Sequence, residues 1–364
     1  MTGRLDRRLV TGNLRLSNPA GHTLGLVFGG CRFSIESNRG EIIEALGAYF
    51  SPFPGDKGTA TVTVTVIEAP PPDFAEPFVL KEPEPGKSRI KEEYLDLENG
   101  RIVRKRLTGM VFVFGEGDNL AVGPCRENLN QVVNFINNRY IEWKLCRGAL
   151  LGHAAGVGLN GNGLALAGFS GAGKSTLALH IMSRGATFVS NDRLMVEKTD
   201  TGLVMHGVAK LPRINPGTIV HNPDLQAILD ADDHRKFKEL PPDELRQLEL
   251  KYDASIDECF GPGRFHLHAD MAGLVVLNWK QQGGPLSIRR VDPLVRTDLL
   301  PAFMKPTGLF FYPGSECRMT DPTPEAYARL LNHGCLWEVS GGVDFHKAAD
   351  ACARFLRYGI MPEI

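Results

Sequence analysis

Alternating apolar and polar positions predict a strand-rich beginning to this chain. The clearest case is residues 59–67, where threonine alternates with apolar side chains in the period of a strand with one buried face. Three further segments pair strand-like runs across a turn that contains glycine, as β-hairpins do: 23–35, 94–104 and 110–122. With a short helix expected at 41–50, residues 1–124 are predicted to form a separate α+β module of unknown role.

Helical periods and short apolar runs alternate through the rest of the chain. Helices are expected at 128–145, 324–332 and 345–357. Runs with the length of strands lie between them: 150–159, 163–167, 187–192, 203–208 and 273–279. This order predicts an α/β domain over residues 125–364. A charged, helix-forming stretch at 224–258 predicts a helical insertion, either a solvated surface segment or a lid that closes over a ligand.

One motif in the second region carries specific chemistry. Gly168–Ser175 reads GFSGAGKS and fits the phosphate-binding pattern G-x-x-x-x-G-K-[ST] at every fixed position. Glycines let backbone N–H groups surround an anion, and the following helix adds the positive end of its dipole. A strand-length run precedes the motif, and a helix that Gly185 can cap follows it. This context favours a nucleoside triphosphate site over an empty glycine turn.

The motif also predicts which residues bind the nucleotide. Lys174 is expected to reach the β- and γ-phosphates, and the Ser175 hydroxyl is expected to bind Mg²⁺. The predicted cofactor-binding residues of the loop share this segment: Gly168, Ser170, Gly171, Ala172, Gly173, Lys174, Ser175 and Thr176.

Asp192 ends the next strand-like run, directly after Asn191. In a parallel sheet the carboxyl end of that strand lies on the same edge as the phosphate loop, so Asp192 is placed to bind Mg²⁺ or to take a proton from an attacking hydroxyl. The alternative is an ordinary turn, which both residue types favour.

Two further side chains are candidates with structural alternatives. His153 is the one titratable residue of the apolar run at 150–159, and it is either a core histidine or part of the active site. Arg213, in a loop with Lys210 and two prolines, is either a second phosphate contact or a surface arginine.

In this order, these motifs resemble the catalytic domain of the HPr kinase/phosphorylase family, and most closely its group called HprK-related kinase B. The resemblance rests on Gly152-His153-Ala154, on Gly168–Ser175 and on Ser190-Asn191-Asp192, and it covers about residues 125 to 320. It implies that the loop holds ATP, that His153 supports the active site, and that the acidic pair handles Mg²⁺ and the substrate hydroxyl. His153, Lys174 and Asp192 are thereby the expected catalytic residues.

Two departures from that family pattern bear on the reaction. The family usually has two aspartates where this chain has Asn191-Asp192, and an amide cannot take up a proton at neutral pH. Either Asp192 serves both metal and proton, or proton removal matters little for a loose transition state, or ATP is bound without efficient transfer. Thr176 also stands where HPr kinases commonly have glutamate.

The composition limits the classes of binding partner that are expected. The 41 basic residues nearly balance the 42 acidic ones, so no overall field favours nucleic acid or an anionic membrane. Seven scattered cysteines without a C-x-x-C pair predict reduced thiols in a cytoplasmic protein. The first residues lead into no long apolar run, so neither a signal peptide nor a membrane span is expected.

Together these features predict an α/β, P-loop protein with an HPr-kinase/PEP-carboxykinase-like catalytic domain behind a smaller α+β domain. The predicted activity is an ATP- and Mg²⁺-dependent kinase that phosphorylates a hydroxyl of a protein serine or a small molecule. A nucleotide-binding switch with slow or no transfer is the alternative, and the acceptor, the base specificity and the oligomeric state are left open.

Overall fold

The structure is a computed structural model, and it describes residues 5–83, 88–314, 317, 319 and 322–363. The chain forms two compact units, and each unit consists of two segments that alternate with those of the other along the sequence. Unit 1 consists of Met1–Gly148 and Thr307–Met319, and unit 2 of Ala149–Pro306 and Thr320–Ile364. The division lies after Gly148 rather than at the expected residue 124, because helix α3 (Leu129–Leu145) packs on the sheet of unit 1. There the ring of Phe135 lies 4.9 Å from that of Phe112.

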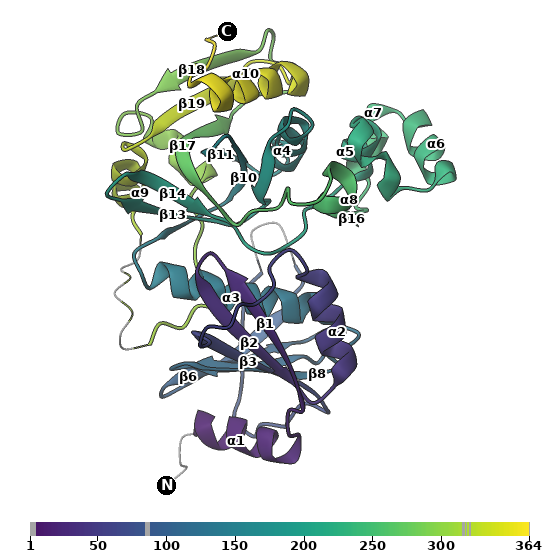
Figure 1. The fold of residues 1–364 in the computed structure, drawn as a ribbon, viewed down its shortest axis with the longest axis vertical. Helices are drawn as coiled ribbons and strands as arrows, with labels where there is room; N and C mark the ends of the chain where they lie inside the picture. The colour runs from purple at the N-terminus through teal and green to yellow at the C-terminus, as the bar shows by residue number, and fades with distance from the viewer. Residues whose placement is uncertain (1–4, 84–87, 315–316, 318, 320–321, 364) are drawn as a thin grey trace. The chain divides into compact units, whose positions relative to one another are not determined.

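Unit 1 is an eight-stranded sheet with helices on both faces (Figure 1). The strands follow the order β1-β2-β3-β8-β7-β6-β5-β4. The elements that precede α3 are α1 (Arg7–Ser17), β1 (His22–Phe28), β2 (Cys31–Ser37), α2 (Gly40–Tyr49), β3 (Val62–Glu68), β4 (Val79–Leu80), β5 (Glu92–Leu97), β6 (Gly100–Lys105), β7 (Val111–Gly115) and β8 (Asp118–Gly123). The three predicted hairpins and the helix at 41–50 are confirmed, whereas α1 was not predicted.

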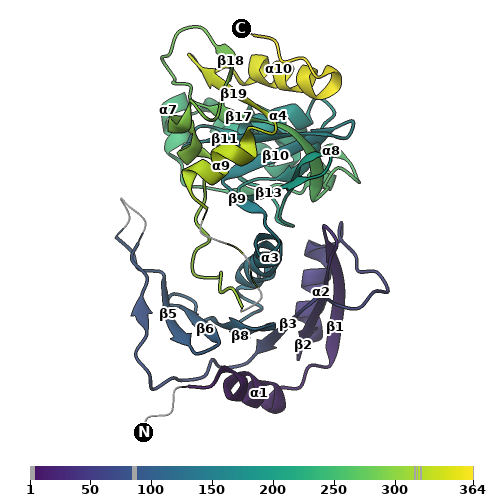
Figure 2. The same ribbon diagram turned by 90° about the vertical axis from the view of Figure 1, so that its left-hand side faces the viewer.

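Alternation along β7 explains the two covered faces. Val111 and Val113 join the apolar cluster that contains Val10 and Leu14 of α1. Phe112 and Phe114 point to the other face, toward α3. Figure 2 shows α1 on one side of the sheet and α2 with α3 on the other. Period-two alternation therefore gives this sheet two separate apolar layers.

Unit 2 is a nine-stranded mixed sheet. The main path runs β12-β10-β11-β17-β14-β13-β9, and β19 pairs with both β17 and β18. Its strands are β9 (Leu150–Gly152), β10 (Ala154–Leu159), β11 (Asn162–Gly168), β12 (Thr187–Ser190), β13 (Leu194–Thr199), β14 (Gly202–His206), β17 (His268–Leu277), β18 (Ser287–Val291) and β19 (Cys335–Ser340). Of these, β13, β18 and β19 were not predicted.

Helices cover both faces of this sheet. Helices α4 (Lys174–Met182) and α10 (Phe345–Tyr358) lie side by side on one face (Figure 1). On the other face, the 3₁₀ helix η2 (Thr297–Ala302) and helix α9 (Pro324–Leu331) contribute to a continuous apolar cluster with Ala165 and Ala167 of β11. The sheet is thus buried on both sides, as the apolar strands predicted.

The direction of the strands determines which ends share an edge. Strand β10 is antiparallel to both β11 and β12, so β11 and β12 run in the same direction. Their carboxyl ends, at Gly168 and Ser190, therefore lie on one edge of the sheet. The shared edge was expected from a parallel sheet, and it is produced here by a mixed one.

A helical insertion interrupts unit 2, beginning slightly earlier than the predicted 224–258. It contains α5 (Pro216–Val220), the 3₁₀ helix η1 (Pro223–Ile228), α6 (Ala231–Glu239), α7 (Pro242–Gln247) and α8 (Ile256–Phe260). A small antiparallel pair formed by β15 (Arg213–Ile214) and β16 (Tyr252–Asp253) closes it.

One prediction about the cysteines is wrong. Cys146 and Cys317 form a disulfide with an S–S distance of 2.10 Å, although all seven cysteines were expected to be reduced thiols. The two residues are 171 positions apart, and only the return of the chain to unit 1 after residue 306 brings them together.

None of the helices in the described ranges has both the length and the apolar character that crossing a bilayer requires.

Candidate functional site

The glycine-rich segment forms a tight loop between a buried strand and a helix. Strand β11 ends at Gly168 and α4 begins at Lys174. Gly171 and Gly173 have φ angles of +81° and +88°, which side chains other than glycine rarely adopt. A Cβ atom on Gly173 would also lie 2.5 Å from Cζ of Phe345. Glycine is therefore required at this position for both backbone conformation and space.

Hydrogen bonds hold the loop in this shape. The Ala172 N–H donates to the carbonyl of Phe169 at 3.1 Å, and the Ala172 carbonyl accepts from Nε1 of Trp279 at 2.9 Å. Nζ of Lys174 donates to the carbonyl of Gly168 at 2.8 Å, so this lysine reaches back over the loop. The Trp279 ring lies edge-on to Phe345, with centroids 5.0 Å apart. Trp279 and Phe345 therefore pack against the loop and stabilise it. Neither residue was predicted from the sequence.

The start of α4 can receive an anion. Gly173 occupies the N-cap position and supplies no side-chain hydrogen bond, so no side chain caps the first turn of this nine-residue helix. Uncapped N–H groups at a helix N-terminus, together with the helix dipole, favour an anion. The hydroxyl of Thr176 lies 2.8 Å from the hydroxyl of Thr218, so the side chain of Thr176 contacts α5. Ser170 and Gly171 are exposed, and Ser175 is half-buried.

His153 and Asp192 are brought together at the end of β12. His153 lies between β9 and β10, where the predicted single strand is interrupted, and its Nε2 is 2.9 Å from Oδ1 of Asp192. Burial acts to raise the pKa of Asp192, but the hydrogen bond from His153 and the charges of Lys305 and Arg193 outweigh it. The pKa of Asp192 therefore lies well below its usual range, and the carboxylate is ionised at neutral pH.

Lys305 is a member of this group that sequence reasoning missed. Its Nζ lies 3.9 Å from Oδ2 of Asp192. The segment that carries it runs beside His153: the His153 N–H donates to the Phe303 carbonyl at 2.6 Å, and the Lys305 N–H donates to the Leu151 carbonyl at 3.3 Å. The two segments can lie this close only because residue 152 is glycine, since a Cβ there would lie 2.2 Å from the Phe303 ring. A lysine in a loop carries no sequence pattern that could have identified it.

Lys174 belongs to the same electrostatic group. Burial lowers its pKa most, the charge of Asp192 opposes this shift, and the charge of Lys305 lowers the pKa further. Lys174, Asp192 and Lys305 therefore influence one another electrostatically at one edge of the sheet. Of the predicted catalytic residues, all three are in this group: His153, Lys174 and Asp192.

Arg213, for which a phosphate contact and a surface position were both open, is half exposed and paired with an aspartate. Its Nε is 3.4 Å from Oδ1 of Asp253 on the neighbouring strand β16, and its side chain is half exposed. The charge of Arg213 also lowers the pKa of Lys210. Burial lowers that pKa most, and the charge of Arg193 has the next largest effect. The structure thus groups Arg213 with Lys210 rather than with Lys174.

Asn191 has an unusual hydrogen-bonding state. Its Oδ1 atom is buried, and no donor from the described residues reaches it. A buried carbonyl oxygen without a donor is costly and is typically satisfied by water or a ligand.

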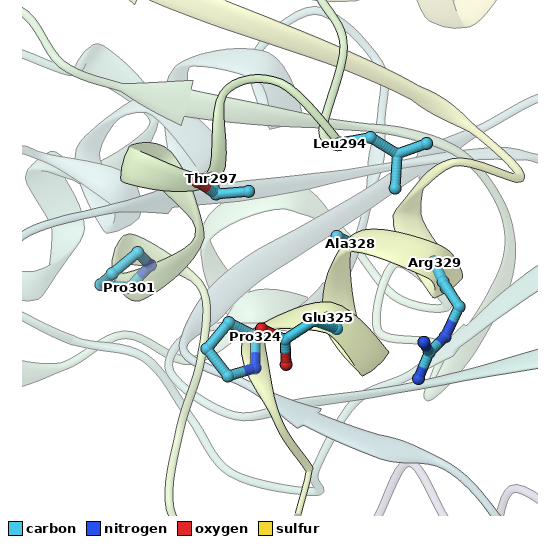
Figure 3. Close-up of a pocket in the computed structure, with 7 residues that line it drawn as sticks. All are labelled: Leu294, Thr297, Pro301, Pro324, Glu325, Ala328 and Arg329. Carbon is cyan, nitrogen blue, oxygen red and sulfur yellow. The ribbon is translucent and has the colours of Figure 1, made fainter.

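A separate cavity of about 520 Å³ lies elsewhere in unit 2 (Figure 3). Aliphatic side chains form most of its wall, with Glu325 and Arg329 beside them. The residues that line it are Leu294, Thr297, Pro301, Pro324, Glu325, Ala328 and Arg329. Since neither the glycine-rich loop nor the group around Asp192 contributes to this wall, the candidate site is distinct from this cavity.

Comparison with known proteins adds little to this geometry. No protein-family model matches the chain, and no curated protein matches it significantly. A solved structure titled as the Hpr(Ser) kinase/phosphatase from Coxiella burnetii matches with a TM-score of 0.29 and 13% sequence identity, covering 57% of this chain and 95% of that chain. Similarity at this level supports no conclusion about activity, so the family resemblance inferred from the sequence motifs stays a prediction.

Proposed function

We propose that unit 2 is an ATP- and Mg²⁺-dependent kinase that transfers the γ-phosphate to a hydroxyl group. The observation that carries the proposal is that the loop with Lys174, at the start of α4, and the His153–Asp192 pair, at the end of β12, lie on the same edge of the sheet. A phosphate-binding loop beside an ionised carboxylate is the arrangement that phosphoryl transfer to or from a nucleotide requires.

The residues of the loop fit a triphosphate. The uncapped first turn of α4 offers N–H donors, and the two left-handed glycines allow the backbone to approach phosphate oxygens closely. Lys174 would exchange its hydrogen bond with the Gly168 carbonyl for contacts to the β- and γ-phosphates. Its positive charge would then stabilise the charge that develops on the transferred group.

The donors near the loop also fit Mg²⁺. This ion prefers oxygen ligands and is usually bound by one or two carboxylates or hydroxyls together with nucleotide phosphates. Ser175 and the ionised Asp192 would provide these oxygens, and the bound ion would neutralise negative charge on the triphosphate. His153 would hold the Asp192 carboxylate in place through its hydrogen bond.

The acceptor hydroxyl would be oriented by His153 and Asp192. Positioning and electrostatic stabilisation contribute most of the catalysis of phosphoryl transfer, and a loose transition state places little demand on a general base. The buried Oδ1 of Asn191 can accept a hydrogen bond but cannot take up a proton.

Asn191 also favours a second candidate function, a nucleotide switch that binds ATP and transfers phosphate slowly or not at all. The Asn191→Asp variant separates this switch from a kinase whose rate is limited by the missing base. A kinase limited by a missing base gains transfer rate, whereas a switch gains none.

The primary test incubates the protein with γ-labelled ATP, Mg²⁺ and an extract of cells that make it, and then separates macromolecules from small metabolites. Wild type should label one fraction, Lys174→Ala should label neither, and Lys198→Ala, at an exposed position of β13, should behave as wild type. Release of free phosphate alone by wild type would reject the kinase and favour the switch.

A further inference from the structure

One residue of the candidate site connects it to the helical insertion. Gly173 is the N-cap of α4, and the Leu177 N–H donates to its carbonyl, so Thr176 belongs to the first turn of the helix. The Thr176 N–H is therefore among the donors that this turn leaves for an anion. The Thr176 hydroxyl, in contrast, lies 2.8 Å from the hydroxyl of Thr218 in α5. Thr176 thus contacts the insertion with its side chain and faces the proposed phosphate position with its backbone.

The direction of these hydrogen bonds follows from the available protons. Oδ1 of Asn215, the N-cap of α5, accepts from the Thr218 N–H at 3.0 Å and from the Thr218 hydroxyl at 3.1 Å. Because a hydroxyl carries one proton, Thr218 has none left to donate to Thr176. The Thr176 hydroxyl therefore donates to Oγ1 of Thr218. Its single proton is used in this bond and is not available to a phosphate oxygen.

The insertion also contacts the other end of α4. Ser183, the C-cap of α4, lies two helical turns after Thr176 and thus on the same face of the helix. The Ser183 hydroxyl lies 3.2 Å from Oδ1 of Asn222, which follows α5. Thr218 and Asn222 are both buried, with exposed fractions of 5% and 1%. The insertion therefore places two fixed side chains along one face of α4.

The contact at α5 extends into the rest of the insertion. A Cβ atom on Gly217 would lie 3.5 Å from Cγ of Leu245, a buried residue of α7. Asn222 caps η1, since its Oδ1 accepts from the Asp224 N–H at 3.0 Å. A change in the position of α5 therefore reaches both α7 and η1 through direct contacts.

We propose that Thr218 is a positioning residue of the nucleotide site, and that its hydrogen bond with Thr176 couples ATP binding to the local stability of the insertion. This inference rests on the proposed nucleotide site. A phosphate bound at the first turn of α4 would fix the backbone of Thr176, and the fixed backbone would keep its hydroxyl on Thr218. Coupling of this kind is reciprocal, so a bonded insertion also raises the affinity for ATP.

Hydrogen exchange of the full chain tests the coupling without any substitution. Amide exchange is measured by mass spectrometry with and without a non-hydrolysable ATP analogue and Mg²⁺. Slower exchange is expected in peptides from α4 and from residues 215–228 when the analogue is bound. Slower exchange in α4 alone would overturn the coupling and leave the nucleotide site standing. Failure of the analogue to bind would reject the nucleotide site itself, and the coupling with it.

Variants at position 218 separate the hydroxyl from the packing of the side chain. Thr218→Val keeps the shape and removes the hydroxyl, so ATP affinity should fall roughly 2- to 10-fold in a fluorescence titration. The slowing of exchange in 215–228 by the analogue should also be lost, and Thr218→Ser should restore both. Thr201→Val removes a hydroxyl that bonds Thr199 in the turn after β13, and it should match wild type. Slowing in Thr218→Val equal to that of wild type would overturn the proposal.

A substitution on the α4 side gives an independent answer. Thr176→Val leaves the bond between Thr218 and Asn215 intact, so it removes only the contact of α4 with α5. It should lower ATP affinity about as much as Thr218→Val, and the double variant should lose no more than the larger single loss. Losses that add in the double variant would show that the two hydroxyls act separately, and this would overturn the proposal.

Discussion

Nε2 of His153 lies 2.9 Å from Oδ1 of Asp192, although a hairpin, a loop and a helix separate the two residues in the chain. The interruption between β9 and β10 places the histidine there, and the end of β12 supplies the carboxylate. The pair therefore depends on the topology of the whole sheet rather than on either strand alone.

Replacing His153 tests its proposed positioning role. His153→Ala should lower kcat about 10- to 100-fold, since the partner that orients a ligating carboxylate typically has an effect of this size. ATP affinity without Mg²⁺ should change little, because His153 contacts Asp192 and not the loop. His268→Ala, at an exposed position of β17, is the control. A kcat equal to wild type would remove His153 from the site.

Trp279 should matter for nucleotide binding through a single hydrogen bond. Trp279→Phe keeps a ring against Phe345 but removes the donor to the Ala172 carbonyl. A lost hydrogen bond of this kind amounts to about 0.5–1.5 kcal/mol, so ATP affinity should fall about 2- to 12-fold in a fluorescence titration. Trp143→Phe removes an indole N–H that has no partner among the described residues, and it should leave ATP affinity unchanged.

Alanine variants of Gly173 and Gly171 allow the cost of steric overlap and the cost of the backbone conformation to be measured separately. Gly173→Ala should destabilise unit 2 by about 2–4 kcal/mol, because it combines a left-handed residue with a clash against Phe345. Gly171→Ala meets open space, so it should cost only the backbone part, about 1–2 kcal/mol. Adding Phe345→Leu to Gly173→Ala should recover part of the difference in urea unfolding. Equal costs for the two single variants would contradict this account.

His180 should make unit 2 sensitive to acid. Burial lowers the pKa of this α4 residue from 6.5 to about 4, and the charges of His346, Arg184 and His221 act in the same direction. Between these two pH values the unfolded chain binds a proton that the folded chain excludes, so the free energy of unfolding falls as pH falls from 6.5 to about 4. The loss should be about 2–3 kcal/mol.

His180→Phe removes this titration and keeps a ring next to Phe345. Urea unfolding of wild type and variant at pH 7 and 4.5 should therefore show a smaller pH dependence in the variant. His268→Phe should retain the dependence of wild type, and equal dependence in all three proteins would exclude His180 as its source.

The candidate site was predictable where the chain carries a local pattern. The loop at Gly168–Ser175 has fixed spacing, and Asp192 follows the next strand of the same sheet edge. Lys305 and Trp279 could not be predicted, because their contacts come from loops brought in by tertiary packing.

The fold shows the same division between local and long-range information. Alternation along residues 59–67 and glycine turns predicted the first sheet, because strand period and turn chemistry are local. The assignment of α3 and of 307–319 to unit 1 depends on contacts between distant segments, such as Phe114 with Phe310. No short-range pattern encodes such a return of the chain.

The disulfide between Cys146 and Cys317 has a consequence for the covalent integrity of the protein. It encloses residues 147–316 in a covalent ring, so the helical insertion that contains α5 to α8 lies inside that ring. A protease that cuts the insertion once would open the ring without releasing a fragment. The clipped protein would keep its full mass in a non-reducing gel and separate into two pieces only after a thiol reductant is added.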